Sequence, residues 1–193
     1  MIKYIKNKIK EKQGLSSLEM VIGALVIVAV FAGMMDFINI SNRMQSLSST
    51  MSYVSKVLSI QGCITSGNPE AIYLDSSGKQ LYDTDYIKTG KFVNANTLFN
   101  TVNEIMSSDG IESDEWRIYI DGALFTPGHT SKLYDFRERI PVRVEIDYTW
   151  ETIGNLLPIN NNLLSGTFNT SQEIVSVYKI RELDINDGFE YSE

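Results

Sequence analysis

One carboxylate, Glu19, stands at the start of an otherwise apolar stretch near the N-terminus. It lies five residues after Gly14, and the next charged residue is Asp36. A carboxylate within a membrane segment costs free energy unless a cation or hydrogen-bond donors compensate it. The chemistry that Glu19 offers is therefore electrostatic pairing. The alternative is an interfacial carboxylate that reaches the lipid headgroups.

The rest of the sequence has no constellation of residues typical of an enzyme. His129 is the only histidine, and its turn-like context, Pro127–His129, favours a surface residue over a general base. The nucleophile-elbow serine motif, the zinc-protease helix motif and a phosphate-binding glycine loop do not occur in the sequence. The segment Asp184–Gly188 fails as a calcium loop, because its glycine comes one position early. We therefore expect no enzymatic activity, no metal and no cofactor.

The single cysteine, Cys63, excludes an intrachain disulfide. Two interpretations remain open for it. It is either a small buried hydrophobic residue just beyond a helix end, or a reactive thiol able to form an intermolecular disulfide. An exported domain with this sequence must rely on packing for its stability.

The charges of this chain are strongly segregated. Five lysines and one glutamate give residues 1–14 a formal charge of +4, so residues 15–193 carry −11 within the total of −7. By the positive-inside rule, lysines beside a first apolar segment keep that end in the cytoplasm and place the acidic remainder outside. An acidic domain also argues against a nucleic-acid partner, which needs a basic surface.

The apolar stretch is long enough to span a membrane. From Leu18 to Ile40 the chain has 23 residues, which as a helix measure roughly 34 Å against a bilayer core of about 30 Å. An ordinary secretory signal has a shorter apolar region that ends in small residues, whereas Met34, Met35 and Asp36 follow here. Asp36 has two interpretations: it marks the outer membrane boundary, or it pairs with Arg43 of a neighbouring helix.

The helical pattern continues beyond the apolar stretch. Apolar residues recur at alternating intervals of three and four, an a/d heptad register sustained for three heptads. The members of this stripe are Phe37, Ile40, Met44, Leu47, Met51, Val54 and Leu58. We predict one helix from about Leu15 to Ile60, with Gly62 as its left-handed cap. The stripe packs against the chain's own globular domain, against helices of other subunits, or against both at different depths.

The remainder predicts a small α+β domain. We expect hairpin strands at 71–74 and 80–82, a helix over 96–107 and strands at 116–120 and 140–150. A short apolar linker at 153–158 that could form one helical turn, a loop at 160–162 and a final strand at 173–183 complete the prediction, followed by an acidic tail. The organisation is thus a leader at 1–14, a long helix at 15–62 whose transmembrane half is about 18–40, an extracytoplasmic α+β region at 63–139, and C-terminal strands with the tail at 140–193. The fold class is α+β with an antiparallel sheet and one or two short helices.

The basic leader, Gly14, Glu19 and the apolar run together resemble the class III signal of type IV pilins and pseudopilins. Towards the C-terminus, an alternating strand at 142–148 leads into the apolar segment 153–158, and a strand at 174–181 precedes Glu182. This order resembles TadE-like pseudopilins of the tight-adherence (Flp-type) pilus system. The resemblance covers residues 12–62 and 140–183, about half of the chain, and residues 63–139 show no family pattern.

The resemblance implies a structural protein, a minor pilin that assembles into or primes a pilus or secretion filament. A prepilin peptidase would cut between Gly14 and Leu15. Glu19 of one subunit would then neutralise the new ammonium group of Leu15 on its neighbour. Its partners would be the peptidase, the membrane and other pilin subunits, with a platform protein and an assembly ATPase acting indirectly. Two alternatives stay open: a major type IV pilin, and a signal-anchored extracytoplasmic binding protein.

Overall fold

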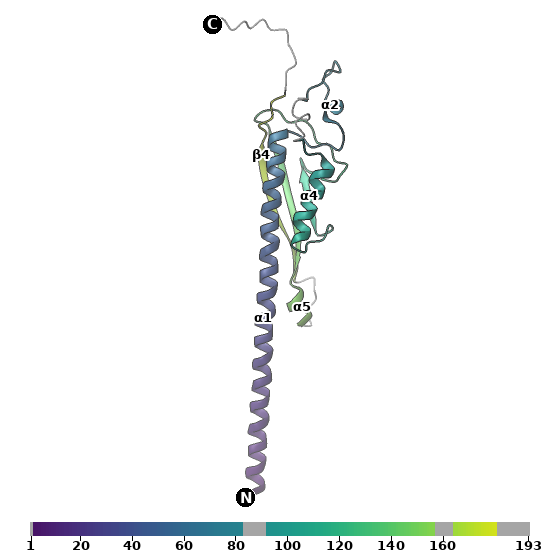
Figure 1. Cartoon of the computed structure of the whole chain (residues 1–193). Coiled ribbons are helices and arrows are strands. Elements are labelled where there is room, and N and C mark those ends of the chain that lie inside the picture. The colour runs from purple at the N-terminus through teal and green to yellow at the C-terminus, as the bar shows by residue number, and fades with distance from the viewer. Residues whose placement is uncertain (1, 83–91, 157–163, 181–193) are drawn as a thin grey trace. The chain divides into compact units, whose positions relative to one another are not determined.

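The computed structural model describes residues 2–82, 92–156 and 164–180, and for residues 2–16 it describes the backbone alone. Its helices and strands confirm the predicted α+β class, and Figure 1 labels all four described helices and strand β4. In chain order the elements are α1 (Ile2–Gln61), α2 (Pro69–Ile72), α4 (Ala95–Ser108), β1 (Trp116–Ile120), β2 (Ala123–Leu124), β3 (Arg139–Thr149), α5 (Glu151–Leu156) and β4 (Ser165–Val175).

The chain divides into two compact units. The first unit comprises Met1–Asn42 and Tyr148–Gly166, and the second comprises Arg43–Asp147 and Thr167–Glu193. Each unit takes one portion of α1, and β3 and β4 cross the boundary near one end of each strand. The acidic tail after residue 184 and the loop expected at 160–162 lie outside the described residues.

Helix α1 begins earlier than predicted but ends where its sequence indicates. It continues through the lysine-rich leader to Ile2, whereas we expected a start near Leu15. At the other end Gly62 adopts φ of 65° and its N–H donates to the carbonyl of Leu58 at 2.9 Å. A Cβ on Gly62 would lie 2.6 Å from the backbone oxygen of Tyr134. Glycine is therefore required there both by conformation and by space.

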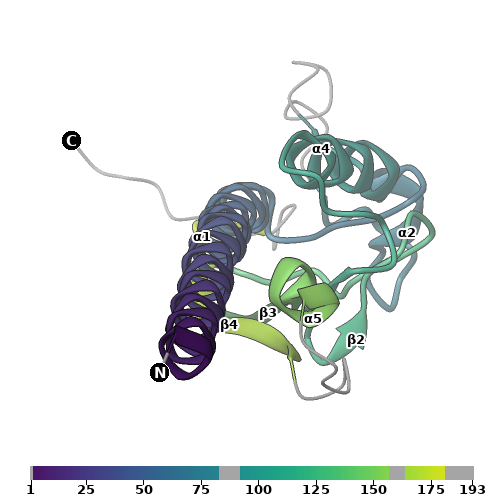
Figure 2. The same ribbon diagram turned by 90° about the horizontal axis from the view of Figure 1, so that it is seen from below.

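The core of the second unit lies between helices and one face of the sheet. Four buried residues of α4, namely Ala95, Leu98, Val102 and Met106, join the buried portion of α1 in a single cluster with the strands. Figure 2 looks along α1, with α4 and the strands beside it. Asn94 caps α4 by accepting the N–H of Thr97 at 2.8 Å.

The sheet has four strands in the order β2-β1-β3-β4. Strands β1 and β3 are antiparallel, with Trp116 opposite Ile146, Ile118 opposite Val144 and Ile120 opposite Val142. These six residues are buried, as the predicted alternation requires. The β1–β2 turn has positive φ at both Asp121 and Gly122, which is the geometry of a tight two-residue hairpin.

Two strand predictions were wrong. At 71–74 the chain begins as helix α2, because Pro69 favours a first helical position and Asn68 accepts the N–H of Glu70. The expected hairpin is reduced to one antiparallel bridge, Leu74 with Gln80. The last strand is β4 at 165–175 rather than 173–183, of which 181–183 lie outside the described residues.

The segment after β4 places its backbone bonds elsewhere. The N–H of Ser176 donates to the carbonyl of Glu138, and the N–H of Val177 donates to the carbonyl of Ser59 at the end of α1. These two N–H groups do not bond to a neighbouring strand in the manner of a ladder. Strand β4 therefore ends at Val175, although we expected a strand through residue 183. The linker predicted at 153–158 overlaps α5, and residues 157 and 158 lie outside the described part.

Candidate functional site

The glycine–glutamate junction lies within an uninterrupted helix. Gly14 and Leu15 belong to α1, as does Glu19, whose side chain is exposed. Glu19 has no hydrogen-bond or ion-pair partner among the side chains that the structure describes. It is therefore a carboxylate at the start of an apolar surface with no described compensation from its own chain.

The surface that follows Glu19 is apolar and exposed on all sides of the helix. Within the described part of the chain, Ser17–Gln61 is the one helix long and apolar enough to cross a membrane, and its best 18-residue stretch has mean hydropathy 2.5 with 11% buried. From Leu18 to Ile38, fourteen large apolar side chains are at least 48% exposed. They are Leu18, Met20, Val21, Ile22, Leu25, Val26, Ile27, Val28, Val30, Phe31, Met34, Met35, Phe37 and Ile38. A helix that is apolar all round needs lipid or other helices around it.

The heptad stripe divides into two groups. Its last four members, Leu47, Met51, Val54 and Leu58, belong to the core of the second unit, and Ile40 is buried as well. Phe37 and Met44 are 64% and 48% exposed. The stripe therefore serves mainly the fold of its own chain, and only its exposed members are available to a partner.

Asp36 is buried and caps another element. Its side chain is 2% exposed, and its two carboxylate oxygens accept the backbone N–H groups of Thr152 at 3.0 Å and Ile153 at 2.9 Å. These donors belong to the first turn of α5, where a capping side chain normally binds. Neither interpretation of Asp36 from the sequence included this contact with residues 116 and 117 positions away.

The sequence did contain a signal for this contact. Trp150 occupies the position before α5, and its side chain has no oxygen to accept a helix N–H. The short helix therefore needs a cap from elsewhere in the chain. Asp36 was the one carboxylate deep in an apolar run, so it needed hydrogen-bond donors. The start of α5 needed an acceptor, and each group supplies what the other lacks.

Helix α5 also packs closely on α1. A Cβ on Gly33 would lie 3.2 Å from Cδ1 of Ile153, so the isoleucine occupies the space that this glycine leaves. Ala32 is 4% exposed although most of its neighbours along α1 are open. Figure 1 shows α5 beside the middle of α1. Gly33 thus provides the space that Ile153 of α5 occupies, and the neighbouring Ala32 is buried as well.

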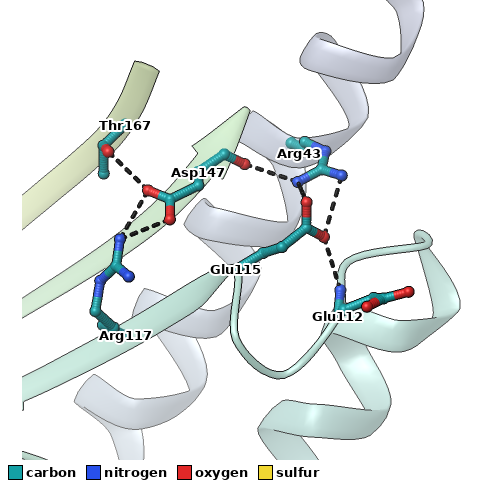
Figure 3. Close-up of polar contacts among 6 residues, drawn as sticks. All are labelled: Arg43, Glu112, Glu115, Arg117, Asp147 and Thr167. Atoms are coloured by element: carbon teal, nitrogen blue, oxygen red, sulfur yellow. Dashed lines mark hydrogen bonds and ion pairs between the residues drawn. The ribbon is translucent and has the colours of Figure 1, made fainter. Parts of the chain in front are cut away.

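The second unit has its own polar network at the other side of the boundary (Figure 3). Arg43 of α1 donates to both carboxylate oxygens of Glu115, at 3.0 and 3.2 Å, and to the backbone oxygen of Asp147 at 2.7 Å. The Arg43 and Glu115 side chains are only 17% and 32% exposed. This network attaches α1 to the start of β1 and the end of β3. Arg43 is therefore engaged within its own chain, which leaves the second interpretation of Asp36, pairing with Arg43 of a neighbour, without support.

Asp147 receives donors from two strands. Arg117 donates to both of its oxygens at 2.7 Å, and Thr167 of β4 donates to Oδ1 at 2.7 Å. Partial burial by itself would raise the pKa of Asp147, but the bonds from Thr167 and Arg117 and the charges of Arg117 and Arg43 lower it overall. The bond from Asp147 raises the pKa of the Arg117 guanidinium in return. The arrangement stabilises an ion pair and holds no acid or base ready for catalysis.

Cys63 and His129 have structural surroundings. Cys63 is fully buried just past the end of α1, and burial raises the pKa of its thiol to about 12, so it is not a reactive thiolate. His129 is half-buried against the ring of Phe125, and burial lowers its pKa. The first interpretation of Cys63 is confirmed, whereas His129 is less exposed than we predicted.

No group of three or more metal-ligating side chains occurs among the described residues. An open depression of about 480 Å³ lies on the outer face of the sheet, between Tyr119, Arg143 and Glu173. The Arg143 guanidinium covers the Tyr119 ring at 4.3 Å, so the depression presents a cation–π pair rather than a nucleophile with its base. No protein-family model, curated protein or solved structure matches the chain.

Proposed function

We propose that this chain is a TadE-like minor pilin, which a prepilin peptidase cuts between Gly14 and Leu15. The mature chain then assembles through the exposed portion of α1 into a type IV or tight-adherence pilus or secretion filament, or primes its assembly. The observation that carries the proposal is the contrast along α1. The apolar residues of its second portion are buried in the chain's own core, while its first portion exposes Glu19 and an apolar surface.

Membrane insertion accounts for the first portion before assembly. Leu18 and the thirteen other exposed apolar side chains match the length of a bilayer core, and the lysine-rich leader favours a cytoplasmic N-terminus. The second unit would then lie outside the cytoplasm. Its lack of a disulfide is compatible with that location because its core is well packed around Leu58 and Leu98.

Assembly accounts for Glu19. An uncompensated carboxylate in a low-dielectric environment is costly, and a free ammonium group from a neighbouring Leu15 would remove that cost. The same pairing would set the axial register between subunits, since a charge pair can form at only one offset along two parallel helices. Energy for assembly would come from a separate cytoplasmic ATPase working through a platform protein in the membrane.

The decisive experiment is intact mass spectrometry of the chain co-expressed with a prepilin peptidase. We expect a mature species that begins at Leu15. A Gly14→Asp variant should stay uncut, because a side chain at this position blocks a site that accepts a residue without Cβ. Gly23→Ala is the matched control, since Gly23 lies in the same helix with open space around it, and that variant should still be cut.

Other products would contradict the proposal. A full-length chain alone, in the presence of an active peptidase, indicates a signal-anchored protein. A product cut beyond Met35 indicates an ordinary exported protein. A correctly cut chain that forms the bulk of a filament would identify a major pilin instead of a minor one.

A further inference from the structure

We propose that α5 and Trp150 insert into the outer lipid leaflet beside α1, as a second membrane contact that Asp36 makes stable by capping α5. The inference rests on the assignment of α1 as a membrane helix under the proposed function. It adds a feature that this assignment does not contain, namely that residues 150–156 return to the bilayer.

The depth of α5 follows from its contacts with α1. Measured from Leu18 at the inner boundary, Gly33 lies roughly 22 Å and Asp36 roughly 27 Å along the helix axis. The outer edge of a bilayer core of about 30 Å is thus near Asp36. Ile153 contacts Gly33 and the N–H groups of α5 bind Asp36, so α5 lies at this edge, with Ile153 on its lipid side.

The hydrogen bonding of α5 suits this place. Backbone N–H groups at a helix start must be satisfied before a segment can leave water. Both carboxylate oxygens of Asp36 meet that requirement for Thr152 and Ile153, and the two N–H groups in turn compensate the buried carboxylate. The Asp36 carboxylate and the N–H groups at the start of α5 therefore offset each other's free-energy cost of leaving water.

The described residues leave the surface of α5 open. None of its six residues is buried, and its exposed residues are Glu151, Asn155 and Leu156, the last of which is 41% exposed. Met34, Met35 and Ile38 are exposed and belong to the same turns of α1 as Gly33 and Asp36, to which α5 is attached. Because they belong to the segment that meets lipid, the occupant we assign to α5 is the same lipid. Trp150 precedes α5, and tryptophan is enriched at the bilayer interface.

The chain offers a direct probe, since Trp116 and Trp150 are its only tryptophans. Trp116 is 4% exposed within the core of the second unit, whereas Trp150 is half-buried at the proposed interface. The full-length Trp116→Phe variant is reconstituted in phosphatidylcholine vesicles that carry bromine on the acyl chains near the headgroup. We expect about a twofold loss of Trp150 fluorescence, because an interfacial indole meets the brominated chains. The Trp150→Phe variant, which retains Trp116, should lose little.

Variants of Asp36 separate capping from charge. Asn keeps one acceptor oxygen for the two N–H groups, so Asp36→Asn should keep part of the quenching, whereas Asp36→Ala should release α5 and reduce it further. If Asp36 acted only by its charge at the membrane boundary, both variants would behave alike, and the inference would be wrong. Should Trp116→Phe fail to fold, the difference between the unaltered chain and Trp150→Phe gives the same measurement.

The remaining outcomes also decide the question. A chain that floats with vesicles but shows no quenching beyond that of Trp150→Phe overturns this inference and leaves the membrane helix intact. Quenching that vanishes as protein is concentrated in the bilayer indicates a second copy over α5 and equally overturns it. A chain that fails to float with vesicles contradicts the membrane assignment of the proposed function, which distinguishes the two failures.

Discussion

The two portions of α1 are both apolar, yet they differ in how their apolar residues are arranged. From Leu18 to Met35 apolar side chains surround the helix on every side, and nearly all are exposed. From Leu47 to Leu58 they form a stripe with serines between them, and the stripe is buried in the chain's own core. Total hydrophobicity therefore does not indicate what a helix contacts, whereas the angular distribution of its apolar residues does.

The charged residues of the two portions of α1 also have different partners. Glu19 in the first portion has no described partner, Asp36 is satisfied by α5, and Arg43 is satisfied by Glu115 and Asp147. The charge without a partner is the one expected to find it in another subunit. Substitutions in the two portions should thus affect different measurements.

The largest effect is expected for Glu19→Ala. Breaking a charge pair in a low-dielectric environment costs about 3–5 kcal/mol, which is at least about a hundredfold in assembly. The amount of filament recovered by pelleting measures it. Cleavage after Gly14 should persist, and Glu104→Ala, on the exposed side of α4, should assemble normally. Unchanged assembly of Glu19→Ala would remove the charge-pairing argument.

Two leucines, one from each portion of α1, allow the same substitution to be compared at a buried and an exposed position. Leu58 is 0% exposed and Leu25 is 60% exposed. Leu58→Ala should lower the free energy of unfolding of the second unit by about 2–5 kcal/mol through the cavity it leaves. Leu25→Ala should leave it unchanged, as measured by urea denaturation in detergent micelles. Equal losses from the two variants would mean that the first portion also contributes to the folded core.

A smaller effect is expected where α1 enters the second unit. Arg43→Met removes the donor of the Asp147 carbonyl and leaves the Glu115 carboxylate with the N–H of Glu112 alone, and should cost about 1–3 kcal/mol in the same denaturation experiment. Arg139→Met is the control. It breaks an ion pair with Glu173 whose side chains are 74% and 61% exposed, and exposed pairs contribute about 0–1 kcal/mol. The prediction fails if Arg139→Met is the more costly of the two.

The smallest effect concerns pH. The pKa of Asp147 is lower in the folded state, so its contribution to stability is complete above its unfolded pKa of about 3.9 and is lost as pH falls through the folded value. We expect under about 1 kcal/mol, since its side chain is 36% exposed. Urea midpoints at neutral and acidic pH should show a smaller decline for Asp147→Asn. A variant with the same decline as the unaltered chain would contradict this role.

Local signals predicted the elements whose stability is local. Gly62 ends α1 and Asn94 begins α4 through their own conformational and capping preferences, and the alternation from Val142 to Ile146 placed β3. The start of α1 was misplaced because the leader was treated as a separate segment. Its lysines are good helix formers and do not interrupt the helix.

Elements that depend on distant contacts were missed. Strand β4 is polar along most of its length, and it is fixed by its place beside β3 and by the Thr167–Asp147 bond. The contact of Asp36 with α5 joins positions more than a hundred residues apart, which periodicity cannot reveal. Of the candidate site, the sequence thus predicted the apolar surface and Glu19, but not how its other charges are satisfied.

The contact between Asp36 and α5 also has a consequence for the order of events during biosynthesis. The residue whose N–H first binds Asp36 is synthesised 116 positions later, so the carboxylate has no hydrogen-bond donor from α5 until most of the chain has been made. Strand β3, which completes the core over Leu58, is likewise late. Because such long-range contacts form only after both partners exist, folding closes near the end of translation. Any truncated chain that stops before Thr152 leaves the Asp36 carboxylate in α1 without these two N–H donors.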